Sequence, residues 1–282
     1  MITAMDIAFY AATACYGVAA LLAARYLWNG DARSLRWASR VLVVGALGLV
    51  ATFLLRWGAW RLVPLTTLSD SLNLLILQVT VIVLIVARKD DVRALLCLCT
   101  PPLAVLAVVN AAVAGDNLHT APRALSGFPL VGHVGLAFLA YALFLVASMT
   151  SVAYVIQDER LKRRRTAGLF QRLPALERLD GILFRVIGCG YVCFLITIVL
   201  GGLWARADSG LLAPHWWLAP KIILSFVMAV FYAVAFHARR SGRLRGPKLA
   251  YAVFLGFSIL LVSYVALSMM DLNTYNFWES SP

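Results

Sequence analysis

The sequence is poor in charge and lacks the short motifs that mark common soluble enzymes. Only 13% of its 282 residues are charged, whereas 62% are hydrophobic. A soluble domain of that composition would expose large apolar patches to water. The chain contains no G-x-x-x-x-G-K-[ST], no H-E-x-x-H and no G-x-S-x-G. The sequence therefore gives no support to phosphate-loop, zinc-protease or serine-hydrolase chemistry.

Cysteines and buried carboxylates are also scarce. The five cysteines fall within or beside apolar segments, and no C-x-x-C or C-x-x-C-H occurs. This excludes a thioredoxin-like pair and covalently attached haem, and favours small packing residues over a disulfide framework. The interiors of the apolar segments hold almost no carboxylates, which argues against an ion-coupled transporter.

What the chain does contain is a series of long apolar runs. A bilayer core about 30 Å thick needs about 20 apolar residues per helix, and no basic region precedes the first run at Ile7, so that run is expected to be retained. The sequence predicts an all-α polytopic membrane protein in a single domain. Its eight transmembrane helices are expected at about residues 7–28, 37–55, 71–87, 94–114, 132–156, 182–204, 222–238 and 249–270.

Lysine and arginine are concentrated in alternate loops. The first, third, fifth and seventh loops are the basic ones, and the formal net charge is +12. Because cytoplasmic loops carry the excess of basic residues, these loops are predicted inside, with both termini outside. Anionic lipid and membrane insertion account for a basic face of this kind, so nucleic acid is not expected as a partner.

Two loops stand out. The basic inner loop 157–181 contains Leu173-Pro-Ala-Leu-Glu-Arg-Leu-Asp180, a pattern suited to a short interfacial helix. The outer loop 205–221 contains Pro214-His-Trp-Trp-Leu-Ala-Pro220. The inner loop is the expected place for a cytoplasmic partner.

The histidines are the first candidates for binding a metal or haem, because no exposed thiol pair is present. His133 opens the fifth span and His215 lies in the tryptophan-containing outer loop, so both are predicted near the outer surface. His237 ends the seventh span, on the predicted inner side. A histidine at a span end can equally be an interfacial polar residue.

Several short segments occur in a characteristic order. They are Pro64-Leu-Thr-Thr-Leu-Ser-Asp-Ser71, His133-Val at a span start, Gly201-Gly-Leu-Trp204, Trp216-Trp217 in an outer loop, and Phe236-His-Ala-Arg239. Together they resemble the cytochrome c assembly family of haem-handling membrane proteins, the CcsA-like group. The resemblance covers about residues 64–275.

The resemblance implies haem as the cofactor and assigns roles to particular residues. His133 matches an outer haem ligand, and His237 matches a membrane ligand near the inner side. Trp204, Trp216 and Trp217 would pack their flat faces against the macrocycle.

Two positions depart from the family pattern. Asn273 stands where the second outer histidine is expected, and Ala219 stands at the acidic position of the tryptophan loop. His215 is then a candidate replacement ligand. These departures make the chain more similar to the compact HemX-like or YpjD-like branch.

Two functions of different classes follow as hypotheses. The first is a haem-handling protein of a bacterial plasma membrane, an assembly factor rather than a catalyst, working with other cytochrome assembly factors. The alternative is a non-catalytic structural or regulatory subunit that keeps the fold without haem and docks a membrane complex through Arg163, Arg164 and Arg165. Transport of a small lipid-soluble molecule is a third hypothesis, but the sequence shows no polar pathway for it.

Overall fold

The computed structural model confirms the expected all-α membrane fold. It describes residues 3–61, 63–65, 67–88, 90–114, 128–164, 172–207, 220–244 and 246–269, of which 90–92, 128–130, 204–207, 221 and 264–269 are described by their backbone alone. Seven helices are long and apolar enough to cross a membrane, and an eighth has a shorter apolar stretch, Pro247–Ser263. The helices are α1 (Ala4–Asn29), α2 (Ala32–Trp60), α3 (Leu68–Val86), the 3-10 helix η1 (Asp90–Leu95), α4 (Leu96–Ala114), α5 (Phe128–Lys162), α6 (Leu176–Ala207), α7 (Pro220–Arg240) and α8 (Pro247–Met269).

The ends of the first helices follow from local sequence chemistry. Thr3 caps α1 through the backbone N–H of Asp6, and the Asp6 carboxylate accepts from the backbone N–H of Thr3 in return. The same reciprocal capping box opens α3 with Thr67 and Asp70. Helix α1 stops at Gly30, which adopts the left-handed conformation (φ 74°) that glycine tolerates best.

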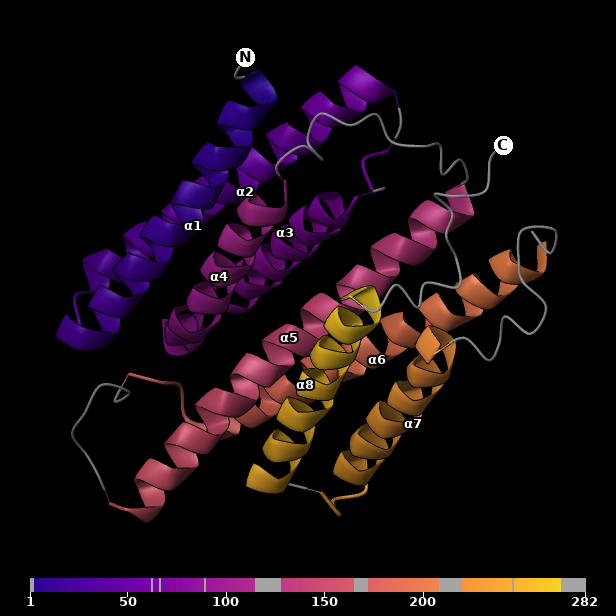
Figure 1. Cartoon of the computed structure of the whole chain (residues 1–282). Helices are drawn as coiled ribbons and strands as arrows, with labels where there is room; N and C mark the ends of the chain where they lie inside the picture. The colour runs from indigo at the N-terminus through magenta and orange to yellow at the C-terminus, as the bar shows by residue number, and fades with distance from the viewer. Residues whose placement is uncertain are drawn as a thin grey trace.

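The eight helices form two rings of four (Figure 1). In the first ring, α1 contacts α2 and α4, and α3 contacts the same two helices. In the second ring, α5 contacts α6 and α8, and α7 contacts the same two. Helix α5 joins the rings through its contacts with α3 and α4. In each half of the chain, therefore, the first and third helices both contact the second and fourth helices.

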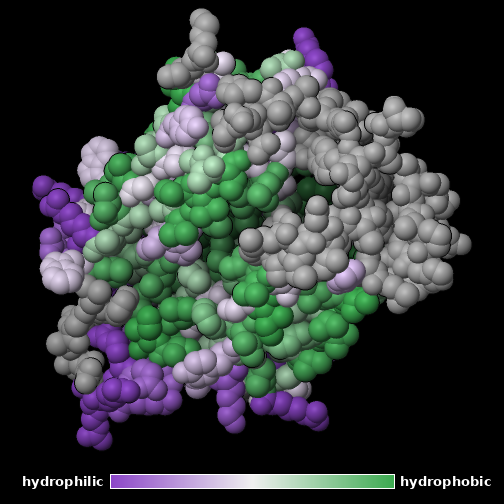
Figure 2. Space-filling view, viewed as in Figure 1, coloured by the Kyte–Doolittle hydropathy of each residue, from purple (hydrophilic) through white to green (hydrophobic). Residues whose placement is uncertain are grey.

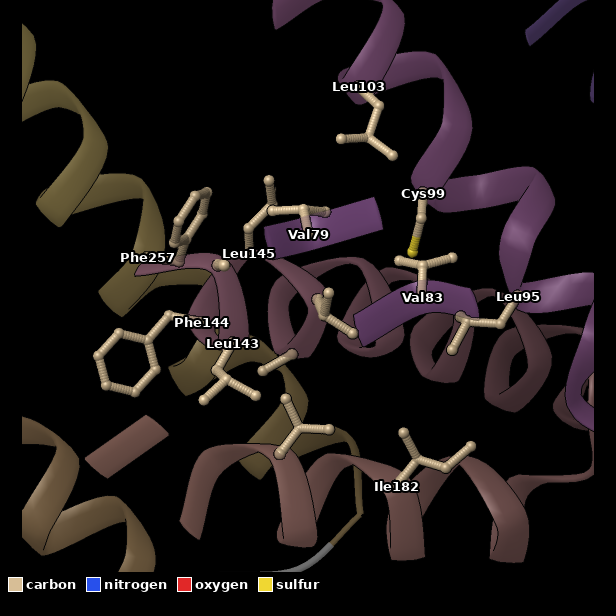
Figure 3. Close-up of a cluster of buried hydrophobic side chains, with 14 of the residues drawn as sticks. Val79, Val83, Leu95, Cys99, Leu103, Leu143, Phe144, Leu145, Ile182 and Phe257 are labelled. Carbon is tan, nitrogen blue, oxygen red and sulfur yellow. The ribbon is translucent and has the colours of Figure 1, made fainter. Parts of the chain in front are cut away.

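Helix α5 is the centre of the molecule. In its most apolar stretch 67% of the residues are buried, against 22–39% in the other six spanning helices. Figure 3 shows the core where side chains of α3 and α4, such as Val83 and Cys99, face Leu143 and Phe144 of α5 and Ile182 of α6. Burial on every side explains why α5 carries apolar residues around its whole circumference.

The two ends of the bundle differ in charge. Odd-numbered helices begin at one end, which we call the His133 end, and finish at the other, which we call the arginine end. Hydrophobic side chains cover the middle of the visible face, and hydrophilic ones gather toward its edges, densely at the lower left (Figure 2). Which end faces the cytoplasm stays a prediction from the loop charges.

Candidate functional site

His133 lies in the first turns of α5, half-buried against α6. Its Nδ1 lies 2.9 Å from the backbone carbonyl oxygen of Thr197. A carbonyl only accepts hydrogen bonds, so Nδ1 must carry the proton and donate. The other ring nitrogen, Nε2, then holds a lone pair. This is the arrangement found for histidines that bind metals, whose second nitrogen donates to a backbone carbonyl or carboxylate.

The close approach of His133 to α6 depends on a glycine. A Cβ atom added to Gly201 would lie 2.6 Å from Cε1 of His133, closer than real side chains come. The next residue, Gly202, has nothing within 4 Å of such an atom. Gly201 is therefore required for the position of the imidazole, whereas Gly202 is not.

His237 lies at the opposite end of the bundle, near the end of α7. It is exposed, and its Nδ1 lies 2.9 Å from the carbonyl oxygen of Ala233, one turn back in the same helix. The preceding Phe236 stacks on Phe184 near the start of α6, at a centroid distance of 5.3 Å. His133 contacts Thr197 instead, thirteen residues further along α6. At 1.5 Å per residue the two histidines are about 20 Å apart along α6, so they cannot bind the same iron atom.

The other residues proposed for haem lie outside what the structure describes in full. His215, Trp216 and Trp217 fall in residues 208–219, and Asn273 follows the last described residue. Only the backbone of Trp204 is described. It lies in the last turns of α6, three residues after Gly201. The roles of these residues stay predictions.

The proposed docking segment is partly described. Arg163 and Arg164 are exposed just beyond α5, and Nε of Arg163 lies 3.1 Å from the Glu159 carboxylate one turn earlier. Arg165 lies outside the described residues. Part of the pattern expected as a short interfacial helix, residues 176–180, forms the first turns of α6 instead of a separate element. Asp180 within it pairs with Arg239 of α7.

A buried ion pair lies at the His133 end, and sequence reasoning did not find it. The second span is expected to end at about residue 55, but α2 continues through Arg56 to Trp60. Its Nε lies 3.1 Å from Oδ1 of Asp70, and the two side chains are 1% and 2% exposed. The guanidinium also lies over the ring of Trp60, 4.1 Å from the centroid. Helix α2 continues past the expected end at residue 55 because Asp70 neutralises this arginine.

Asp70 belongs to the motif Pro64–Ser71 noted in the sequence, and its carboxylate serves two groups. Besides Arg56, it accepts a hydrogen bond from the backbone N–H of Thr67, at 3.2 Å, and so begins α3. Further along the helix, Nδ2 of Asn110 donates to Oδ1 of Asn73 at 2.8 Å. A third bond, from Nε2 of Gln78 to the carbonyl of Gly135 at 3.1 Å, ties α3 to α5 two residues after His133.

A cleft of about 520 Å³ opens between the two rings. Helices α3, α4, α5 and α8 line it with leucine, valine, proline and aromatic side chains, including Phe138, Tyr141 and Phe257. None of the described residues that line it is a histidine, cysteine or methionine. This cleft therefore offers room for an apolar group but none of the usual soft or imidazole ligands of iron.

Comparison with known proteins decides the family. The sequence model described as cytochrome C assembly protein matches residues 65–272, most of the chain. The chain belongs to this family. The matched part includes Asp70, His133 and His237, but not Arg56.

Individual relatives agree with that assignment. HemX of Brevibacillus brevis is 30% identical over 149 residues, which is 53% of this chain and 53% of HemX. The cytochrome c biogenesis protein CcsA of Synechococcus sp. (strain CC9902) is 26% identical over 275 residues, covering 89% of this chain and 90% of that protein. CcsA of Solanum tuberosum is 26% identical over 260 residues, or 82% of this chain and 80% of its own. They confirm the predicted relationship to the CcsA-like family, with a HemX-like relative among its members.

The relatives come from bacteria and from plants, so they identify a multi-pass membrane protein without fixing the membrane. Within the part of the chain that the structure describes, no group of three or more His, Cys, Asp or Glu residues is placed to hold a metal ion.

Proposed function

We propose that the protein handles haem during cytochrome c assembly, with His133 as an axial ligand at the His133 end of the bundle. Membership of the cytochrome c assembly family supports a role in cytochrome c biogenesis. Relatives that cover most of the chain carry the name cytochrome c biogenesis protein CcsA. Handling of haem is the finer proposal, and it depends on the imidazole.

The observation that supports this role is the hydrogen bond from Nδ1 of His133 to the Thr197 carbonyl. This bond fixes the tautomer and the ring orientation, so that Nε2 of His133 would hold an iron atom through its lone pair. Gly201 allows the ring to lie against α6. Haem would supply the redox-active iron, and the chain would supply an oriented ligand in an apolar setting.

The tryptophans are proposed as the walls of the same site. Trp204 follows Gly201 by three residues, the spacing of neighbouring positions on a helix surface. Trp216 and Trp217 would add flat aromatic faces, and His215, which precedes them in the sequence, is the proposed second ligand. His237 is proposed for a separate site at the arginine end, since it is too far from His133 to share its iron.

An absorption spectrum of the detergent-purified protein, with haem quantified as the pyridine haemochrome, tests this function. We expect a Soret band in the wild type and its loss or a shift in His133→Ala. Gly201→Ala should weaken or shift the band because the new methyl group displaces the imidazole. Gly202→Ala, which meets nothing within 4 Å, is the matched control and should leave the spectrum unchanged. A band unaffected by His133→Ala would remove this histidine from the site.

The alternative is a regulatory subunit that docks a membrane complex without haem. The exposed Arg163 and Arg164 favour it, because they directly follow the long α5 at the arginine end. A colourless preparation that retains a co-purifying partner, and loses that partner when Arg163, Arg164 and Arg165 are changed to Gln, would support docking in place of haem handling.

A further inference from the structure

Four arginines meet around a single cavity at the arginine end. The cavity measures about 370 Å³ and lies where α2 begins, α3 ends and η1 leads into α4. Arg36 and Arg40 come from α2, Arg88 follows α3, and Arg93 lies in η1. The volume lies within the range of pockets that bind small ligands, about 300–1,000 Å³.

The charge of this cavity goes beyond what membrane topology requires. Topology needs basic residues on one side, but not several of them around one hollow. Among the residues whose side chains the structure describes, no acidic residue lines the cavity, and Arg36, Arg40 and Arg88 form no ion pair with any of them. Elsewhere at this end some basic side chains do have carboxylate partners, as in Lys162–Asp158 and Arg239–Asp180. Like charges this close repel one another unless an anion lies between them.

The other half of the cavity is apolar and lies deeper along the helices. Val43 follows Arg40 by three residues, Leu84 precedes Arg88 by four, and Leu96 follows Arg93 by three. Each apolar residue is therefore about one turn, or 5 Å, further into the bundle than its arginine. Val43 is 43% exposed. The cavity thus has a cationic layer at the surface and a hydrocarbon layer one turn below.

We propose that this cavity is a specific site for an anionic phospholipid. The guanidinium groups would bind the phosphate oxygens through paired N–H donors. The first methylenes of an acyl chain would lie against Val43 and Leu84, above the buried Leu96. Basic pockets between transmembrane helices are suited to acidic lipid headgroups, and the apolar layer favours a lipid over a free phosphate ion. The site is separate from His133 and stands whether or not haem is bound.

Native mass spectrometry of the full chain, titrated with phosphatidylglycerol or with phosphatidylcholine of the same acyl chains, tests the proposal. The wild type should retain phosphatidylglycerol preferentially. Arg40→Gln with Arg88→Gln should weaken that binding by roughly 30-fold, given the contribution of each arginine near a membrane surface. The matched control is Arg240→Gln with Arg243→Gln, which removes two exposed charges at the same end but outside the cavity. The control should bind within about twofold of the wild type.

Three outcomes would overturn the proposal. Equal losses in the two double variants would mean that only the diffuse charge of this end matters. Equal binding of the two lipids would remove the anionic specificity. Displacement of phosphatidylglycerol by equimolar inorganic phosphate would indicate a soluble anion instead of a lipid. Should the Arg40/Arg88 variant not fold, Arg36→Gln, at an exposed position, replaces it with an expected loss of about fivefold.

Discussion

At the scale of single residues, the buried ion pair Arg56–Asp70 is a feature of the first ring that carries a large desolvation cost. Both charges are removed from water, and a charge in the apolar part of a membrane is costly unless it is paired. The geometry compensates for that cost. Nε and Nη2 of Arg56 lie 3.1 and 3.4 Å from the two oxygens of Asp70, and Trp60 covers the guanidinium. The pair holds the end of α2 to the start of α3.

Arg56→Ala should destabilise the protein by about 3–5 kcal/mol, because it leaves the Asp70 carboxylate buried without its cation. In detergent we expect the apparent melting temperature to fall by roughly 10 °C. The double variant Arg56→Met with Asp70→Asn removes both charges and should recover most of the loss. Arg61→Ala, at an exposed position just after α2, is the control. Equal melting temperatures for Arg56→Ala and the wild type would contradict a structural role for the pair.

The sequence could not reveal this pair from residue types alone. Arg56 and Asp70 are fourteen positions apart, on either side of the turn that contains Pro64. Only the antiparallel contact of α2 with α3 brings them together. His133 differs, because its position at the start of a span can be seen in the sequence and predicts a haem ligand without knowledge of its partner Thr197.

At the scale of helices, α1 and α2 pack closely at two glycines of α2. A Cβ atom at Gly48 of α2 would lie 2.9 Å from Cβ of Ala12 in α1, and one at Gly45 would lie 3.2 Å from Cβ of Cys15. Helix association within lipid gains little from hydrophobicity, so close backbone packing at small residues supplies much of the attraction.

Gly48→Leu should separate α1 from α2 and cost about 1–3 kcal/mol through overpacking. Gly58→Leu, in the same helix but with nothing within 4 Å of an added Cβ, should have little effect. Thermal unfolding of the two purified variants gives the comparison. If both variants melt together with the wild type, the glycine contact is not a determinant of α1–α2 packing.

Helix lengths also carry information that hydropathy alone does not. Helix α5 has 35 residues and α6 has 32. At 1.5 Å per residue each is about 50 Å long, against a hydrocarbon core of about 30 Å. Both must therefore extend beyond the apolar layer. The charged last turns of α5, with Asp158, Glu159 and Lys162, match that extension.

At the scale of the whole molecule, two four-helix rings share one order of contacts, although the sequence shows no internal repeat. Packing depends on shape and on small residues at the contacts, and many sequences meet those needs. Helix α5 belongs to the second ring and also contacts α3 and α4 of the first ring. Its high burial follows from that double role.

The predicted orientation can be tested by labelling single cysteines in a cysteine-free background. Arg61→Cys, between α2 and α3, should react with a membrane-impermeant maleimide added to intact cells. Arg163→Cys, between α5 and α6, should react only after permeabilisation, because the basic loops are expected inside. The reverse pattern would overturn the outward placement of both termini and of the His133 end.

The sequence by itself determined the class of the protein, the number and order of its helices, and the candidate histidine at the start of α5. These depend on apolar runs and short motifs, which are local properties. Only the tertiary structure decided that His133 bonds to α6 while His237 lies at the other end, that Arg56 pairs with Asp70, and that four arginines enclose one cavity. Those facts depend on which helix faces meet, and a linear pattern does not specify the neighbours of a helix in three dimensions.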